Sequence, residues 1–336
     1  MQSSNPQFLR SDESSPQAWR PQSWTGGFYR LFNRLRFLRK ELRLSEEVSL
    51  VGTDFLEGHI KVGGAIAPGC LTIGFYRSAQ VSRLSGRALD QQRMAIAYNG
   101  CGWDAVSRAP ASGVVVYFAE NPARSIMSAR AHEFFMEAGR ARAGARVAYA
   151  SRPTAMGAKL ECAIRSALQI MENNDNDSDR EKLSAWIYED LLSLASCVID
   201  DIAGGAIEPW PGKGQANRYE LASRIEELLW SDPETAETPL LSLDVVASIF
   251  GCSRRQVQMA VLENFGVGFT ELKRCIRLHQ AFRALNETDR HQNISMIAQV
   301  YEFDHLGRFA NYYMQMFGML PSAQLRERWR GSTPGS

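Results

Sequence analysis

The stretch GCSRRQVQMAVLENFG, at 251–266, combines arginine and glutamine side chains with a regular apolar spacing. Val257, Val261 and Phe265 recur every fourth residue, which predicts a helix with one buried face. Arginine can donate two hydrogen bonds to guanine, and glutamine can pair with adenine in the same bidentate way. The stretch therefore fits either a helix that only packs, with its arginines in solvent, or a helix that lies in the groove of a nucleic acid.

The pattern of this stretch occurs a second time in the chain. At an offset of 51 residues, Leu243, Val246 and Ala247 match Ile294, Ile297 and Ala298. Beyond the turn the offset is 52, and Val257, Val261, Phe265 and Gly266 match Phe309, Tyr313, Phe317 and Gly318. Each unit reads as a short helix, a tight turn and a longer helix, with a small alanine where the helices cross. This is the layout of a helix-turn-helix, whose second helix can enter the major groove of DNA.

The starts of both second helices carry capping signals. Ser253 with Gln256 three residues later makes a capping box, and Asp304 is the expected N-cap of the second unit. Between the units, FTELKRCIRLHQAFRALN predicts a long amphipathic helix that would hold them at a fixed distance. The helices expected in this part of the chain are 217–230, 243–250, 253–265, 269–286, 294–301, 305–316 and 322–329.

The charge of the chain is local rather than global. The whole chain has 38 basic and 37 acidic residues, a formal charge of +1, so no overall field attracts nucleic acid or membrane. Residues 253–330 hold 11 Arg/Lys and 7 Asp/Glu, which is 11 − 7 = +4, whereas 218–252 hold 2 and 7, which is 2 − 7 = −5. The basic excess follows the expected groove-facing segments, as phosphate binding requires.

The first two thirds of the chain predict a different architecture. Residues 1–26 are rich in Ser, Gln and Pro and are expected to be disordered. Residues 28–44 are expected to form a basic amphipathic helix that is docked on the domain behind it, lies on a membrane or serves as part of an import signal, with docking favoured. Short strand-like segments fill 48–120, typical of a small β-barrel or sandwich, and helices are expected at 127–139, 153–171 and 179–202. The expected class is α+β: a sensing and dimerisation domain over 27–203, a Gly/Pro-rich linker at 204–217 and an all-α domain over 218–330.

Residues 218–330 resemble the DNA-binding domain of the AraC/XylS transcriptional regulators. The resemblance rests on the two unequal units, the RLHQAFRAL-type connecting helix and the ending FGMLPSAQLRERW. Within that family, YEFDHLGRFANYYMQMFG is most similar to the ethanolamine-operon regulator type. The resemblance assigns base reading to Arg255, Gln258 and Met259 in the first unit, with Arg254 beside them. Met259 departs from the long polar residue usual there, so it could contact a thymine methyl but not hydrogen-bond as arginine does.

In the second unit the matching positions give fewer hydrogen-bonding groups. The resemblance places Leu306, Gly307, Arg308, Ala310 and Asn311 on the reading helix, with His305 at its entrance. Only Arg308, Asn311 and His305 carry useful hydrogen-bonding side chains. The family usually has glycine at the turn where this chain has Glu302, so we expect a distorted turn or weaker DNA contact there. The first unit should supply more of the sequence readout.

The resemblance also implies that the first domain binds a small-molecule effector. Tyr76, Tyr98, Trp103 and Phe118 are the aromatic candidates for its pocket, although aromatic residues in strand-like segments more often belong to a core. No enzyme, metal or cofactor is expected: only His59 of the five histidines lies in the strand region, and no phosphate-binding loop, nucleophile elbow or HExxH motif is present.

The sequence predicts a cytoplasmic, ligand-responsive DNA-binding regulator of transcription, with activation favoured over repression. Its scattered cysteines, without a CxxC pair, fit a reducing compartment. Expected partners are double-stranded DNA read in two adjacent major grooves, a small-molecule effector, RNA polymerase, and a second copy of the chain. The helix 179–202, with Trp186, Ile187, Leu191, Leu194 and Val198 largely on one side, is the expected dimer surface. The alternative is a helical interaction scaffold that binds protein or a membrane surface and never reads DNA.

Overall fold

A computed structural model shows two compact units in the chain. It describes residues 7–11, 24–100, 102–140, 147–148, 153–174, 176–205, 213–231, 241–287 and 293–331. Unit 1 comprises 1–28, 35–57 and 62–210, and unit 2 comprises 29–34, 58–61 and 211–336. Within the expected linker at 204–217, residues 206–212 lie outside the described residues, and 213–217 already belong to a helix.

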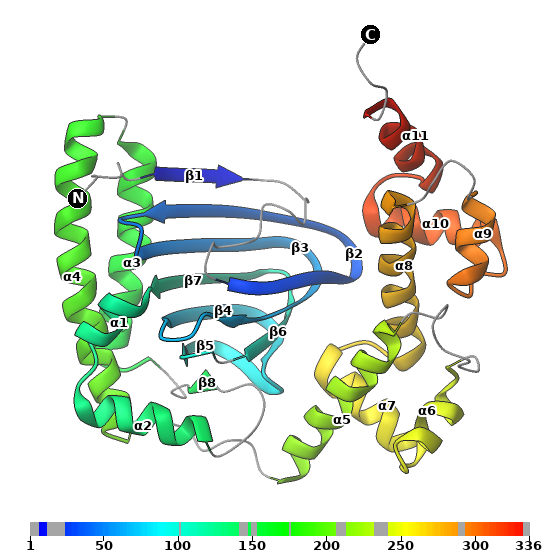
Figure 1. The fold of residues 1–336 in the computed structure, drawn as a ribbon, viewed down its shortest axis with the longest axis horizontal. Coiled ribbons are helices and arrows are strands. Elements are labelled where there is room, and N and C mark those ends of the chain that lie inside the picture. The colour runs from blue at the N-terminus through cyan, green and yellow to red at the C-terminus, as the bar shows by residue number, and fades with distance from the viewer. Residues whose placement is uncertain are drawn as a thin grey trace. The chain divides into compact units, whose positions relative to one another are not determined.

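Unit 1 is built on one curled antiparallel sheet (Figure 1). Its strands are β1 (Gln7–Ser11), β2 (Trp24–Arg43), β3 (Val48–Ile66), β4 (Leu71–Leu84), β5 (Arg87–Tyr98), β6 (Gly102–Arg108), β7 (Ala111–Phe118) and β8 (Val147–Ala148). β4 pairs with β7 along 71–78 and with β6 at 83–84, so it changes neighbours along its length. This exchange, with an irregularity between Ser78 and Ser82, lets the sheet curl into a half-barrel. The predicted fold class is confirmed.

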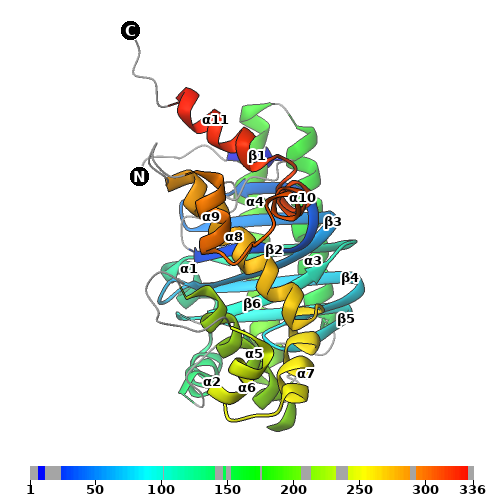
Figure 2. The ribbon, with the colours of Figure 1, turned by 90° about the vertical axis from the view of Figure 1, so that its right-hand side faces the viewer.

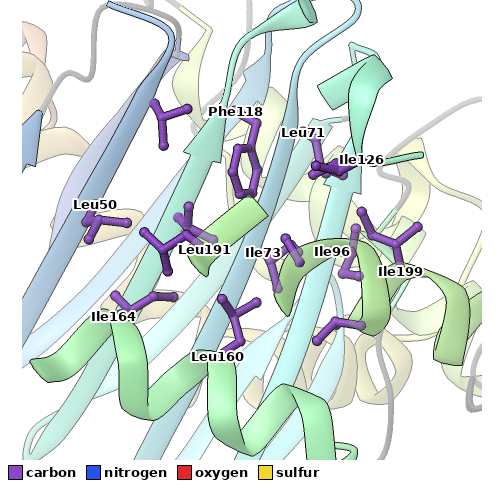
Figure 3. Packing of buried hydrophobic residues seen from close by; sticks show 14 of the residues in the cluster. Leu50, Leu71, Ile73, Ile96, Phe118, Ile126, Leu160, Ile164, Leu191 and Ile199 are labelled. Carbon is purple, nitrogen blue, oxygen red and sulfur yellow. The ribbon is translucent and has the colours of Figure 1, made fainter. Parts of the chain in front are cut away.

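Helices cover one face of this sheet. They are α1 (Glu120–Ser125), α2 (Ala129–Arg140), α3 (Ala155–Asn173) and α4 (Asp177–Ala203). Because side chains alternate across a strand, Leu71, Ile73 and Phe118 point to the same face and pack with Leu160 and Leu191 of the helices (Figure 3). All five are buried. The core of unit 1 therefore lies between α3, α4 and the convex side of the sheet, which leaves the concave side for another role.

Two expectations for the amino-terminal part are wrong. Residues 24–43 form strand β2 and not an amphipathic helix. The buried residues Leu35, Phe37, Arg39 and Glu41 alternate, as in a strand, but two of them are charged. The Arg39 guanidinium contacts the Glu41 carboxylate at 3.0 Å, so the charges are paired inside and conceal the apolar alternation. Residues 7–11, expected to be disordered, form β1 and pair with 39–43, whereas 1–6 and 12–23 lie outside the described residues.

Unit 2 consists mainly of helices arranged around one long helix. They are α5 (Lys213–Trp230), α6 (Leu243–Ile249), α7 (Arg254–Phe265), α8 (Phe269–Glu287), α9 (Ile294–Val300), α10 (Leu306–Phe317) and α11 (Pro321–Gly331). α8 contacts α5 and α7 on one side and α9, α10 and α11 on the other. Figure 2 shows it as the rod between the yellow-green helices and the orange-red ones.

Apart from 28–44, the helices predicted for both units are confirmed, with ends that differ by at most four residues, the largest difference being the start of α5. α1 was not predicted, because its six residues, ENPARS, are too few to show a period. Among the described residues, no helix is both long and apolar enough to cross a membrane.

Candidate functional site

The two repeated parts of unit 2 share one backbone design. We call α6–α7 the first helix-turn-helix and α9–α10 the second. Their short helices are capped in the same way: the Ser242 and Asn293 side chains accept hydrogen bonds from the backbone N–H groups of Val245 and Met296. Their long helices both end at a left-handed glycine, Gly266 or Gly318. The repeat read from the sequence is therefore a repeat in the structure.

The turn between the helices also has the same geometry in both copies. Gly251 has φ of 59° and Glu302, its counterpart, has φ of 66°. The next residue closes each turn with a similar hydrogen bond, from Cys252 N to Ala247 O at 2.9 Å and from Phe303 N to Ala298 O at 2.8 Å. The prediction that Glu302 distorts the second turn is therefore wrong. A side chain occupies a left-handed position there without changing the turn.

Glu302 is held in this conformation by helix α8. Its carboxylate pairs with the Lys273 ammonium and, at 3.2 Å, with the Arg277 guanidinium, whose side chain is only 5% exposed. Arg277 also donates to Gln280 Oε1 at 2.9 Å, and Gln280 Nε2 donates to the Trp230 carbonyl at 3.1 Å. Because a buried charge is costly unless it is paired, this chain of contacts ties the second turn to α8 and to the end of α5.

The outward face of α7 carries the side chains assigned to base reading. Arg254, Arg255, Gln258 and Met259 are all exposed, while Val257, Ala260 and Val261 on the opposite face are buried. The predicted capping box is present: the Ser253 side chain accepts from Gln256 N, and Gln256 Oε1 accepts from Ser253 N at 2.8 Å. Gln256 is thus engaged in the cap, and Arg254 lies 3.3 Å from the Asp244 carboxylate. Arg255, Gln258 and Met259 form the outward surface.

The outward face of α10 is less polar. His305, Arg308 and Asn311 are exposed, and so are the apolar Leu306 and Met314. The helix begins after His305, which forms no side-chain cap hydrogen bond, so the prediction of Asp304 as N-cap is wrong. The backbone sets the helix start one residue later than the sequence signal indicated. Phe309, Tyr313 and Met316 are buried in the core of the second helix-turn-helix.

One further residue on α7 was not predicted as part of the reading surface. Leu262 is 53% exposed although it is a large apolar side chain. It lies seven residues after Arg255 and three after Met259, and this spacing places all three on one helix face. The helical period itself could have identified Leu262. Its counterpart in the second helix-turn-helix is Met314, which is 39% exposed.

A cavity opens on the concave face of the unit 1 sheet. Its volume is about 150 Å³ and its lining is mostly apolar. Small side chains create the space, since Gly74, Gly113, Ala95, Ala97 and Ala105 all lie on this face. They belong to four neighbouring strands, β4, β7, β5 and β6. A sheet that curls around small residues leaves a hollow that larger side chains would fill.

The Tyr76 side chain lines this cavity and packs against two glycines of the sheet. Gly113 is its register partner across β4 and β7, and Gly74 is two residues before it on the same strand. A methyl group at Gly74 would lie 2.8 Å from the Tyr76 hydroxyl oxygen, and one at Gly113 would lie 3.2 Å from its Cδ1. Both glycines are therefore needed for the ring to lie against the sheet. Burial raises the pKa of Tyr76 to about 12, so its hydroxyl is neutral at physiological pH.

The structure separates the four aromatic pocket candidates. Tyr76 lines the cavity. Tyr98 and Phe118 lie on the opposite face of the sheet, in the core against the helices, where the Tyr98 hydroxyl is 3.2 Å from His132 Nδ1. Trp103 is on β6, but its side chain is outside the part that the structure describes. Of the three candidates whose side chains the structure describes, only Tyr76 is placed where it can meet a ligand in this cavity.

The expected dimer face of α4 is divided. Leu191 and Val198 are buried in the core of unit 1, and Ile187 and Leu194 are partly buried against it. Trp186 is 79% exposed and so lies on the other side of the helix. The apolar stripe read from the sequence is the face that α4 turns to its own sheet, because that face is the larger apolar one. In the residues that the structure describes, no group of three or more His, Cys, Asp or Glu could hold a metal ion.

This arrangement, two helix-turn-helix units joined by one long helix with an exposed second helix in each, defines a class of nucleic-acid-binding domain. The comparison with family models agrees: residues 246–327 match the family described as "Helix-turn-helix domain". The match starts in α6, ends in α11 and includes α8. We identify residues 246–327 as a helix-turn-helix domain of the AraC type, as the resemblance indicated.

Individual proteins are similar to this chain over different lengths. The "Probable thc operon regulatory protein" of Rhodococcus erythropolis is 34% identical over 92 residues, which span 27% of this chain and 27% of that relative. A solved AraC-type transcriptional regulator from Chromobacterium violaceum is 24% identical and is aligned over 36% of this chain and 99% of its own, with a TM-score of 0.30. ToxT from Vibrio cholerae is 14% identical over 91% of this chain and 98% of its own, with a TM-score of 0.29.

Proposed function

We propose that the protein is a sequence-specific DNA-binding regulator of transcription that is controlled by a small molecule bound in unit 1. The observation that carries the proposal is the exposed outward face of α7 and α10 on a duplicated frame. Arg255 and Gln258 carry the donors and acceptors that read guanine and adenine, and neither is covered by the chain's own side chains. Activation of transcription and a contact with RNA polymerase belong to the same proposal.

The connecting helix supports reading of two adjacent major grooves. α8 has 19 residues, and a helix of that length is about 28 Å long. Successive major-groove faces on one side of DNA are about 34 Å apart. A rod of this length between the two units is of the right order for both reading helices to enter the same side of a duplex.

The test is selection of bound DNA from a random pool with the full chain. We expect enriched sequences with two conserved blocks about one helical turn apart. Arg255→Ala should weaken binding to the selected DNA by about 1 to 3 kcal/mol and relax the preference at one base step. Arg124→Ala is the matched control, since Arg124 is an exposed arginine of unit 1.

An unenriched pool would favour the alternative, a helical scaffold that does not read DNA. Equal binding by Arg255→Ala and the parent, with Arg124→Ala also unchanged, would remove Arg255 from the reading surface. A loss that is equal for every DNA sequence would assign Arg255 to phosphate contact, because phosphates carry no sequence information.

A homodimer is part of the proposal, with its surface on the exposed side of α4. Trp186 supports this placement, since an exposed tryptophan is a common anchor of protein interfaces. Sedimentation of the full chain should show a dimer that Trp186→Ala weakens. An unchanged sedimentation coefficient for the variant would move the dimer surface elsewhere.

A further inference from the structure

The cavity of unit 1 carries information on the size of its ligand. An engineered protein cavity of about 150 Å³ binds benzene, and the volume here is about 150 Å³. A single ring with one or two small substituents therefore fits without rearrangement of the sheet. A long alkyl chain exceeds this volume and would extend out of the cavity.

The lining favours a flat ring. One face of the Tyr76 ring rests on Gly74 and Gly113, and the same residue lines the cavity. The ring also packs against the cluster of Ile66, Leu84, Ala95 and Ala97, so a ligand meets the part of the ring that remains open to the cavity. Aromatic rings pack against each other in offset or edge-to-face arrangements, which add to the gain from burial of apolar surface. Hydroxyl groups at Ser49, Thr53 and Thr72 lie in the same lining and can donate to or accept from a polar substituent.

The two charged residues that line the cavity are arginines that already have carboxylate partners. Arg39 is paired with Glu41 at 3.0 Å, and Arg77 is paired with Glu161 at 2.8 Å. Each of the two carboxylates also binds a second arginine, Arg43 at Glu41 and Arg165 at Glu161. Because the rest of the lining is mostly apolar, burial of a charged ligand group there would be costly, and an uncharged ligand is favoured.

We propose that this cavity binds an uncharged single-ring compound, about the size of phenol, packed against the Tyr76 ring, and that such a compound is the effector. The proposal rests on the proposed function, because it names the chemical class of the molecule that controls DNA binding. The structure assigns Tyr76 as the main contact and the small residues Ala95, Ala97 and Ala105 as the determinants of ligand size.

The test titrates the full chain with three probes: phenol, benzoate and decanoate. Phenol is the neutral ring, benzoate has the same ring with a negative charge, and decanoate is the long-chain anion. We expect saturable binding of phenol, at least about tenfold weaker binding of benzoate, and no saturable binding of decanoate. Benzoate binding as tight as phenol would overturn the uncharged class, and decanoate binding without phenol binding would overturn the single-ring class.

Three variants locate the site. Ala97→Leu fills the cavity and should weaken phenol binding by about tenfold or more. Tyr76→Ala enlarges the cavity and should weaken phenol while it admits the two-ring 1-naphthol, which keeps the proposal testable if Ala97→Leu does not fold. Tyr98→Phe is the matched control, because Tyr98 lies on the opposite face of the same sheet. Phenol binding that both cavity variants leave unchanged would place the ligand elsewhere.

Binding of the selected DNA is measured in the same samples. If phenol does not bind but DNA is still selected, the proposed ligand class is wrong and the proposed DNA-binding function stands. If phenol binds as expected but no DNA is selected, the proposed DNA-binding function is wrong and the ligand site stands. Phenol binding that does not change DNA affinity would show that the compound is not the effector.

Discussion

The two helix-turn-helix units have the same frame but different outward surfaces. In the first, α7 presents Arg255, Gln258 and Met259, whereas the matching positions of α10 are Gly307, Ala310 and Asn311. The buried faces, by contrast, correspond closely: Val257 and Val261 match Phe309 and Tyr313, all buried. The frame is conserved between the copies by packing, while the outward side chains differ because packing does not constrain them.

The copies also differ in how the shared turn is stabilised. Gly251 reaches its left-handed conformation without a side chain, and a Cβ there would meet nothing within 4 Å. Glu302 reaches the same conformation with contacts to Lys273 and Arg277 on α8. A residue other than glycine in this conformation costs about 1 kcal/mol or more. The second turn therefore depends on its ion pairs, and the first depends on its sequence alone.

The largest change in the free energy of unfolding is expected when Glu302 is replaced by glycine, the residue found at the matching position of the first turn. Glu302→Gly relieves the backbone but leaves Arg277 buried without its carboxylate, and breaking a buried pair typically costs about 3 to 5 kcal/mol. After the backbone gain, the free energy of unfolding should fall by about 2 to 4 kcal/mol. Urea unfolding of the full chain measures this change.

Two controls accompany Glu302→Gly. Gly251→Ala should cost only about 1 kcal/mol, because it adds backbone strain and removes no ion pair. The double variant Glu302→Gly with Arg277→Met should recover part of the loss, since an apolar side chain replaces the buried charge. A stabilised Glu302→Gly protein would show that the backbone strain outweighs the pairs, and the comparison of the turns would then be reversed.

The second effect concerns the outward surfaces. Gly307 matches Arg255, is exposed, and has open space around an added Cβ, which would meet nothing within 4 Å. Gly307→Arg should tighten binding by about 1 to 3 kcal/mol for DNA with guanine at the facing base step, and should leave other sequences less affected. Selection from a random pool shows the new preference directly.

Gly268→Arg is the control for Gly307→Arg. Gly268 also has open space at its Cβ position, but it precedes α8 and lies outside both reading helices. It adds the same charge to unit 2, so it should strengthen binding to all DNA sequences equally if at all. A gain of the same size and sequence independence in both variants would remove α10 from base reading.

The helices of unit 2 could be predicted because independent signals in the sequence indicate the same helix ends and the same buried face. The apolar period, the capping box at Ser253 and the terminal Gly266 all indicate the same helix. Strand β2 could not be recognised in this way. Its inward positions include Arg39 and Glu41, which are acceptable in the interior only because they pair with each other and with neighbours. That pairing is a tertiary fact, and the local pattern of 28–44 favours a helix instead.

The position of the cavity could not be predicted from the strand pattern alone. Alternation tells that Phe75 and Tyr76 point to opposite faces, but it does not tell which face the helices cover. A signal was present in the neighbours: Thr72, Gly74 and Ser78 share the face of Tyr76, and they are small or polar, whereas Leu71, Ile73 and Phe75 are large and apolar. This comparison places Tyr76 on the hollow side, and the same reasoning applied to β7 places Phe118 in the core.

The smallest effect is expected at the starts of the reading helices, where one copy is capped and the other is not. Ser253→Ala removes the capping box of α7 and should lower the free energy of unfolding by about 1 kcal/mol. His305→Ser supplies α10 with a hydroxyl at an N-cap whose backbone is already extended, with φ of −120° and ψ of 104°, and should raise it by up to about 1 kcal/mol. Hydrogen exchange of the first-turn amides of each helix separates these changes from effects elsewhere, and Ser193→Ala on the exposed side of α4 controls for the loss of a hydroxyl. Slower exchange at α10 in His305→Ser, with α7 unchanged, would show that the copies differ at this position in their caps alone; unchanged exchange at α10 would mean that its first turn is stabilised by something other than an N-cap side chain.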